Sequence, residues 1–338
     1  MPSGSSSKSS KPKPSEVASE TKKHYIPLIK KHYAEQWRVH SFIIQQPLLQ
    51  LNFLERPVDV SPPVFAVYHG DPVDFALGWA AQVQLPIPFI CAANDKRAGG
   101  DWETGVLGYE ERLCRRSTLA ANLVTPGPDS RCHEHYPIPS TGAIVSPQVV
   151  VFRGPHEKYE KLPPDQWKAL PVVSVTPTRW PKLTQNGTKY SFADERELVR
   201  EKMRGALRIC AYNEYTHVVI GDFGLGNGYR NPPQEFAELW REVFLYDPDL
   251  RGRIACVAFV FEDPKQSTTQ LIQDDIAKKS SKSSKSSSSG SSSNSKSSSS
   301  SSSYPTDHAI FAHVFSGNEI QRVLGQPDSR YGLNNLLA

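Results

Sequence analysis

Short apolar runs alternate with amphipathic segments along most of this chain, and this alternation restricts the fold more than any other feature. The runs with the length and composition of buried strands are 64–68, 87–93, 143–152, 171–176, 217–221 and 254–261. The segments with helical spacing are 24–38, 71–83, 108–122, 192–212 and 232–245. Strands that alternate with helices, and that carry no regular polar face, are typical of a sheet covered on both sides. The pattern predicts an α/β sandwich in which a parallel or mixed sheet lies between two helical layers.

Two low-complexity tracts interrupt this pattern. Residues 1–20 are rich in Ser, Lys and Pro, and residues 278–303 consist almost entirely of Ser and Lys. Such tracts lack the apolar side chains needed to offset the entropy of ordering, so both are predicted to be disordered. Apolar residues resume at 309–315. We therefore expect one domain over 21–338, with residues 278–303 as an insertion.

The charges and cysteines limit the class of protein. Residues 1–20 carry +1 and residues 278–303 carry +5, so the formal net charge of +4 leaves about −2 for the rest of the chain. The folded part is therefore not expected to bind nucleic acid through a basic surface. Five cysteines without a CxxC pair, together with the lack of an apolar leader or an 18-residue apolar run, favour a monomeric cytosolic or nuclear protein without a membrane span.

The first glycine-rich loop ends in two adjacent carboxylates. Gly99 and Gly100 allow close approach of the backbone to a ligand, and Glu110 and Glu111 follow at the start of a helical segment. Adjacent residues do not share a helix face, so these two carboxylates can have different roles, one holding a sugar hydroxyl and one donating a proton. Alternatively, they only interact favourably with the dipole of the helix.

The second glycine-rich loop, residues 221–233, contains four glycines between an apolar run and a helical segment. A loop of this kind can bind a diphosphate through backbone amides and the start of the following helix. It lacks the Lys-Ser/Thr end of a P-loop, and a flexible connector is the alternative interpretation.

Taken together, the loops resemble the microbial-type poly(ADP-ribose) glycohydrolase family. That family has three glycines, six to eight residues, then Gln-Glu-Glu and a helix close to Ser-Leu-Cys-Arg-Arg-Ser-Thr-Leu. Here Gly99-Gly100-Asp101 and Tyr109-Glu110-Glu111 precede Arg112-Leu-Cys-Arg-Arg-Ser-Thr-Leu119 in the same register. Two further family motifs are similar to Ser146–Arg153 and to the loop at 221–233. The similarity covers roughly residues 24–325, apart from the Ser/Lys tract.

The resemblance implies a macrodomain-like fold of three α/β/α layers and a glycosidase that acts on poly- or mono-ADP-ribose. It implies that Glu111 is the general acid and that Glu110 holds ribose hydroxyls. Neither a metal nor a cofactor is implied. The substrate-binding residues that it implies are Gly99, Gly100, Gly224, Leu225, Gly226, Asn227 and Tyr229, the last against the distal ribose. The adenine-contacting acid is either Asp71 or Asp74.

Several positions depart from the family pattern. Asp101 replaces the third glycine and brings a negative charge, Tyr109 replaces Gln, and Cys91 replaces Asn; the second loop is one residue longer at Asn227 and Gly228. These departures favour the alternative function, a macrodomain that binds ADP-ribose without turnover. Two other features are expected to carry no chemistry. Residues 132–135 (Cys-His-Glu-His) lack a second cluster at zinc spacing, and Trp180 is expected to pack in the core or in a loop.

Overall fold

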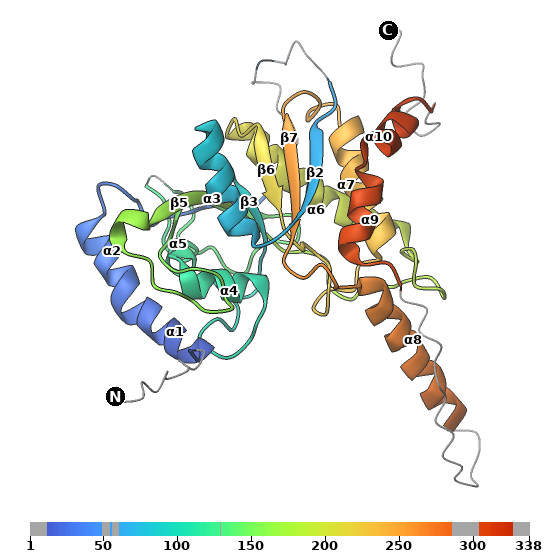
Figure 1. The fold of residues 1–338 in the computed structure, drawn as a ribbon, viewed down its shortest axis with the longest axis horizontal. Helices are drawn as coiled ribbons and strands as arrows, with labels where there is room; N and C mark the ends of the chain where they lie inside the picture. Colours follow the sequence, from blue (N-terminus) through green and yellow to red (C-terminus); the bar gives the residue numbers. More distant parts are fainter. Residues whose placement is uncertain (1–11, 49–54, 56–60, 129, 286–303, 327–338) are drawn as a thin grey trace, which may run out of the picture.

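The protein folds around one mixed sheet with helices on both faces (Figure 1). This computed structural model describes residues 12–48, 55, 61–128, 130–285 and 304–326. The strands are β1 (Phe42–Ile44), β2 (Val64–His69), β3 (Phe89–Ala92), β4 (Ala143–Val151), β5 (Lys168–Val175), β6 (His217–Ile220) and β7 (Cys256–Phe261). Their order is β1-β4-β5-β3-β6-β7-β2. The five strands from β5 to β2 are parallel to one another, whereas β4 is antiparallel to both of its neighbours, β5 and β1. The predicted three-layer sandwich with a mixed sheet is confirmed.

Two hydrophobic cores lie on opposite faces of the sheet. Because successive strand residues point to opposite faces, Val172 of β5 joins the core beneath the helices α3, α4 and α5, and Val173 joins the core beneath α6, α7 and α9. The bounds of these helices are α3 (Pro72–Val83), α4 (Tyr109–Arg116), α5 (Leu119–Asn122), α6 (Ala193–Tyr212), α7 (Pro233–Tyr246) and α9 (Asp307–Val314). Strands buried on both sides explain the uninterrupted apolar runs of the sequence.

The predicted helix over 108–122 is two helices in the structure. Ser117 is extended, with φ −148° and ψ 178°, and pairs with Val151 of β4. The amide of Thr118 donates to the carbonyl of Val150 at 3.0 Å. Pairing with β4 gives Ser117 and Thr118 backbone hydrogen-bond partners in the sheet in place of those within a continuous helix. It also fixes the end of α4 against the sheet.

The prediction that residues 1–20 are disordered is wrong for Pro14–Glu20, which form α1. The helix continues through a π-helical turn (Thr21–Tyr25) into α2 (Ile26–His32). Val17 and Ala18 are buried, and Glu20 accepts a hydrogen bond from Arg153 at 2.5 Å. These tertiary contacts offset the entropy cost of ordering a segment with few apolar residues, and local composition does not reveal such contacts.

The Ser/Lys tract also begins later than predicted. Helix α8 (Thr268–Lys285) includes the first eight residues of the tract, and the remainder, 286–303, lies outside the described residues, as do residues 1–11. The chain returns as α9 and α10 (Gly317–Leu324), and Phe311 of α9 packs against Phe259 of β7 with ring centroids 5.0 Å apart. Each helix in the described part of the chain is too short or too polar to cross a lipid bilayer.

Candidate active site

The two glycine-rich loops leave neighbouring strands at the same edge of the sheet. Strands β3 and β6 are parallel and paired, so the loop from β3 to α4 and the loop from β6 to α7 both begin at their carboxyl ends. This is where ligands bind in open α/β sheets. The side chain of Tyr109, at the start of α4, interacts with the buried carboxyl of Asp222 in the second loop. Tyr109, which departs from the family pattern, therefore joins the two loops directly.

The carboxylate of Glu111 lies in a space that glycines leave open. A Cβ added at Gly100 or at Gly108 would overlap the two carboxylate oxygens of Glu111. The backbone amide of Asp101 approaches Oε1 of Glu111 at 3.4 Å. Gly100 has φ +54°, a conformation that side chains disfavour. The first loop thus wraps the carboxylate of Glu111 with backbone alone.

Glu110 lies deeper, with 2% of its surface exposed, and its Oε2 accepts a hydrogen bond from the amide of Asn94 at 2.7 Å. Burial raises the pKa of Glu110 to about 8, outweighing the opposing effect of the amides of Asn94 and Gly99. The nearby charge of Glu111 raises the pKa further. At neutral pH the Glu110 carboxyl is therefore mostly protonated. The structure thus places two adjacent carboxyl groups in different environments, as the sequence predicts.

The side chain of Asp101 is directed away from these carboxylates. It forms an ion pair with Arg97 and stays half exposed, while its backbone amide faces Glu111. Salt and solvent weaken exposed charges, and a neighbouring guanidinium opposes the charge of Asp101 directly. The negative charge noted in the sequence is thus compensated within the first loop.

The backbone amides of the second loop are not equally available. Those of Leu225 and Gly226 already donate hydrogen bonds, to the carbonyl of Asp222 at 3.2 Å and to Oγ1 of Thr268 at 2.7 Å. The amides of Gly224, Asn227 and Gly228 have no partner among the described residues. The sequence named Leu225 and Gly226 as diphosphate contacts, but in this structure their amides are occupied.

The loop itself is rigid because its ends are fixed. Gly224 and Gly226 have φ of +73° and +77°. The side-chain amide of Asn231 donates to the carbonyls of Gly224 and Thr178 at 2.8 and 2.9 Å, and its oxygen accepts from the hydroxyl of Tyr190 at 2.8 Å. Because its φ values and its ends are held by buried groups, the loop is preorganised rather than a flexible connector.

Tyr229 of the second loop contacts Arg179, which follows β5. The Arg179 guanidinium is 5.2 Å from the ring centroid of Tyr229. Burial raises the pKa of Tyr229 above its usual value, and the charges of Glu110 and Glu111 contribute to this rise. Arg179 is exposed and forms no ion pair among the described residues. Arg179 was not predicted from the sequence as a site residue, although it follows the carboxyl end of β5, at the same edge of the sheet as both loops.

The acids at the β2–α3 junction both contact Arg116. Oδ1 of Asp71 caps α3 by accepting from the amides of Val73 and Asp74 at 3.0 and 2.9 Å, and its Oδ2 accepts from Arg116 at 2.8 Å. Asp74 also pairs with Arg116. Arg116 therefore holds both acids at the β2–α3 junction.

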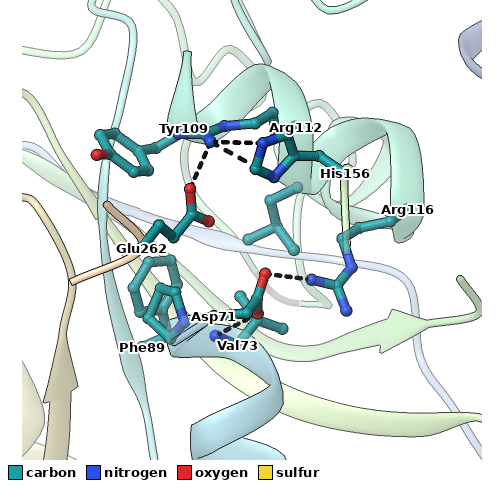
Figure 2. Close-up of a pocket in the computed structure, with 10 residues that line it drawn as sticks. Asp71, Val73, Phe89, Tyr109, Arg112, Arg116, His156 and Glu262 are labelled. Atoms are coloured by element: carbon teal, nitrogen blue, oxygen red, sulfur yellow. Dashed lines mark hydrogen bonds and ion pairs between the residues drawn. The ribbon is translucent and has the colours of Figure 1, made fainter. Parts of the chain in front are cut away.

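A small cavity adjoins this junction and extends beneath the start of α4 (Figure 2). Asp71 points toward Arg116, and Glu262 points toward Arg112, with which it forms an ion pair. The Arg112 guanidinium also lies 4.5 Å from the ring centroid of Tyr109. Two separate sets of ion pairs thus line parts of the cavity, and the one formed by Arg112 and Glu262 supports the ring of Tyr109.

Buried carboxyls should make the stability of this fold depend on pH. Burial raises the pKa of Asp222 and of Glu262 to about 7, and that of Glu110 to about 8. The folded protein therefore keeps protons that the unfolded chain releases above about pH 4. The contribution of these three carboxyls to the free energy of unfolding is therefore complete below about pH 4, and it is lost as the pH rises through their folded-state pKa values of about 7 and 8.

We expect the free energy of unfolding, measured by urea denaturation, to fall between pH 5 and pH 8. Asp222→Asn should flatten this dependence, whereas Asp263→Asn, at an exposed position of the neighbouring loop, should not. A parent protein whose stability rises over the same interval would contradict the assignment of these protons.

Comparisons with known proteins agree with the fold. Residues 31–154 match the family model of the microbial-type PARG catalytic domain. A solved poly(ADP-ribose) glycohydrolase from Thermomonospora curvata is similar in fold, with a TM-score of 0.57 and 16% identity over 78% of this chain and 98% of that one. The structure described as the glycohydrolase of that organism bound to the inhibitor ADP-HPD gives 0.55 and 16% over 79% and 98%. No curated protein sequence matches the chain. The resemblance is confirmed: the chain has the macrodomain-like fold of poly(ADP-ribose) glycohydrolases and carries, in residues 31–154, the catalytic-domain signature of the microbial type.

Proposed function

We propose that this protein is an ADP-ribose glycohydrolase that cleaves O-glycosidic linkages of poly- or mono-ADP-ribose, with Glu111 as the general acid. One observation supports this most strongly: the Glu111 carboxylate lies in a backbone pocket of the first loop, and Tyr109 joins that loop to a preorganised second loop. The solved protein of similar fold is described as a poly(ADP-ribose) glycohydrolase, and one of its structures contains the inhibitor ADP-HPD.

The reaction needs one proton donor and one water. As the bond between the anomeric carbon and the leaving oxygen breaks, Glu111 protonates that oxygen, and positive charge develops on the sugar. Water then adds to the anomeric carbon and returns a proton to Glu111. The acid thus ends as it began, and the products are ADP-ribose and the free hydroxyl of the leaving group.

Glu110 has a different role because it is buried. A carboxyl that is mostly protonated at neutral pH can both donate and accept hydrogen bonds. It would hold the hydroxyls of the reacting ribose without adding a full negative charge near the diphosphate. Tyr229 would pack against the distal ribose from the opposite loop.

The diphosphate would bind the second loop. The amides of Gly224, Asn227 and Gly228 are available there, and Asn227 and Gly228 are exposed. The loop is one residue longer at Asn227 and Gly228, and the additional amide there would replace those of Leu225 and Gly226, which already donate to Asp222 and Thr268. Backbone amides at the start of a helix bind phosphate without a side-chain cation.

The test is to incubate the protein with poly(ADP-ribose) and, separately, with a serine-linked mono-ADP-ribosylated peptide, and to quantify released ADP-ribose by chromatography. We expect release from at least one substrate. Calorimetric titration with ADP-ribose should accompany the assay. Binding without turnover would instead establish the non-catalytic reader, and the absence of both binding and turnover would exclude both functions.

A further inference from the structure

Trp180 does not lie in the core, one of the two locations that the sequence suggests, but packs against Arg230 of the second loop. Its side chain is 56% exposed, and its backbone has φ +52°, which is rare for a bulky residue. The amide of Trp180 donates to the carbonyl of Tyr229 at 2.7 Å, so the second loop fixes this conformation. Residues held in sparsely populated backbone conformations cluster at active sites and ligand-binding positions.

One face of the indole is supported by a fixed cation. The guanidinium of Arg230 lies 4.8 Å from the Trp180 ring centroid. Arg230 is itself buried and hydrogen-bonded to Asp275 at 2.8 Å, to Asn227 at 2.9 Å and to the carbonyl of Gly226 at 3.1 Å. The indole is therefore held from one side, and its large exposed fraction remains for a ligand.

The preceding residue adds a positive charge toward the reacting end of the site. Arg179 lies over the ring of Tyr229, and its charge acts on Glu110. Arg179 and Trp180 follow the carboxyl end of β5, which pairs with β3 on one side of the site, whereas Asp71 and Glu262 follow β2 and β7 on the other side. A substrate that spans the site would extend its leaving group toward one of these two ends.

The chemistry of the polymer identifies which group fits there. In poly(ADP-ribose) the leaving oxygen is a ribose hydroxyl of the next unit, and that unit carries an adenine and a diphosphate. A base stacks on an exposed aromatic face, and a guanidinium recognises phosphate. A peptide serine as leaving group carries neither.

We propose that Trp180 and Arg179 form a subsite for the adjoining ADP-ribose unit of the polymer, with its adenine on the indole and its diphosphate at the guanidinium. This subsite rests on the proposed function, because it binds the leaving group of that reaction. It favours polymer over substrates whose leaving group is a single amino-acid side chain.

The experiment compares kcat/KM on poly(ADP-ribose) and on the serine-linked peptide for the parent, Trp180→Ala, Trp180→Phe and Arg179→Gln. We expect Trp180→Ala to lower kcat/KM on polymer by about tenfold and on the peptide by less than about twofold, with Trp180→Phe close to the parent. Arg179→Gln should lower the polymer value selectively and make it less sensitive to salt.

The outcomes separate the two proposals. Equal losses on both substrates, or none on polymer, would overturn the subsite while leaving the glycohydrolase in place. Release of ADP-ribose from neither substrate by the parent would overturn the proposed function, and the subsite with it. Circular dichroism of each variant shows whether the fold is retained, and Trp180→Phe preserves the ring should Trp180→Ala fail to fold.

Discussion

Replacing Glu111 with glutamine should reduce the rate of ADP-ribose release by about 10²–10⁴-fold while changing the affinity for ADP-ribose only slightly. Glutamine has nearly the same shape as glutamate but cannot protonate the leaving oxygen. The first loop holds the side chain through backbone contacts and free space, both of which an amide tolerates. Single-turnover kinetics on poly(ADP-ribose) measures the chemical step, and calorimetry measures the affinity.

A matched control comes from the same loop. Glu103 is exposed and hydrogen-bonds to Lys22 at 2.8 Å, so Glu103→Gln removes a carboxylate without touching the pocket of Glu111. This variant should keep the parent rate. If Glu111→Gln also kept the parent rate, the proton would have to come from another group, and Glu110 would be the first alternative to test.

The second large effect is expected from Gly108→Ala. A methyl group at this position would overlap the Glu111 carboxylate, which is the flexible end of a side chain, so the carboxylate should move while the backbone stays in place. Gly108 has φ −67° and ψ 163°, which alanine adopts without strain. A displacement of about 1 Å can cost about 10²-fold in rate. We expect a loss of that order in the rate of ADP-ribose release.

Gly105→Ala is the control for this change, because an added Cβ there meets nothing within 4 Å. It should leave the rate near that of the parent. Thermal unfolding of both variants distinguishes a displaced carboxylate from a destabilised domain, since loss of an N-cap glycine alone costs only a few tenths of a kcal/mol to about 1 kcal/mol. Equal rates for Gly108→Ala and Gly105→Ala would show that the position of the Glu111 carboxylate does not control the reaction.

Most of the sheet could be predicted from the sequence because its strands are buried on both faces. The apolar runs around Ile90, Val219 and Phe259 have no other stable location in a folded chain, and glycine-rich loops after two of them indicate the ligand-binding edge. The different surroundings of Glu110 and Glu111 could also be predicted, because adjacent residues on a helix do not share a face.

Other features depend on contacts that sequence patterns do not contain. Helix α1 forms because Val17 and Glu20 meet partners far along the chain, and α4 ends because Ser117 pairs with Val151. The amide of Gly226 is occupied by Thr268, which is 42 residues away. The exposure of Trp180 could not be predicted either. Its backbone conformation is fixed by a hydrogen bond to the carbonyl of Tyr229, which is 49 residues away in the sequence.

The central claim is that the two glycine-rich loops bind one ADP-ribose with its reacting ribose beside Glu111. A crystal structure of the protein with ADP-ribose tests this most directly. We predict that the diphosphate contacts the amides of Gly224, Asn227 and Gly228, and that the anomeric hydroxyl lies within hydrogen-bonding distance of the Glu111 carboxylate. A nucleotide bound away from these loops, or one whose reacting ribose points away from Glu111, would contradict the account.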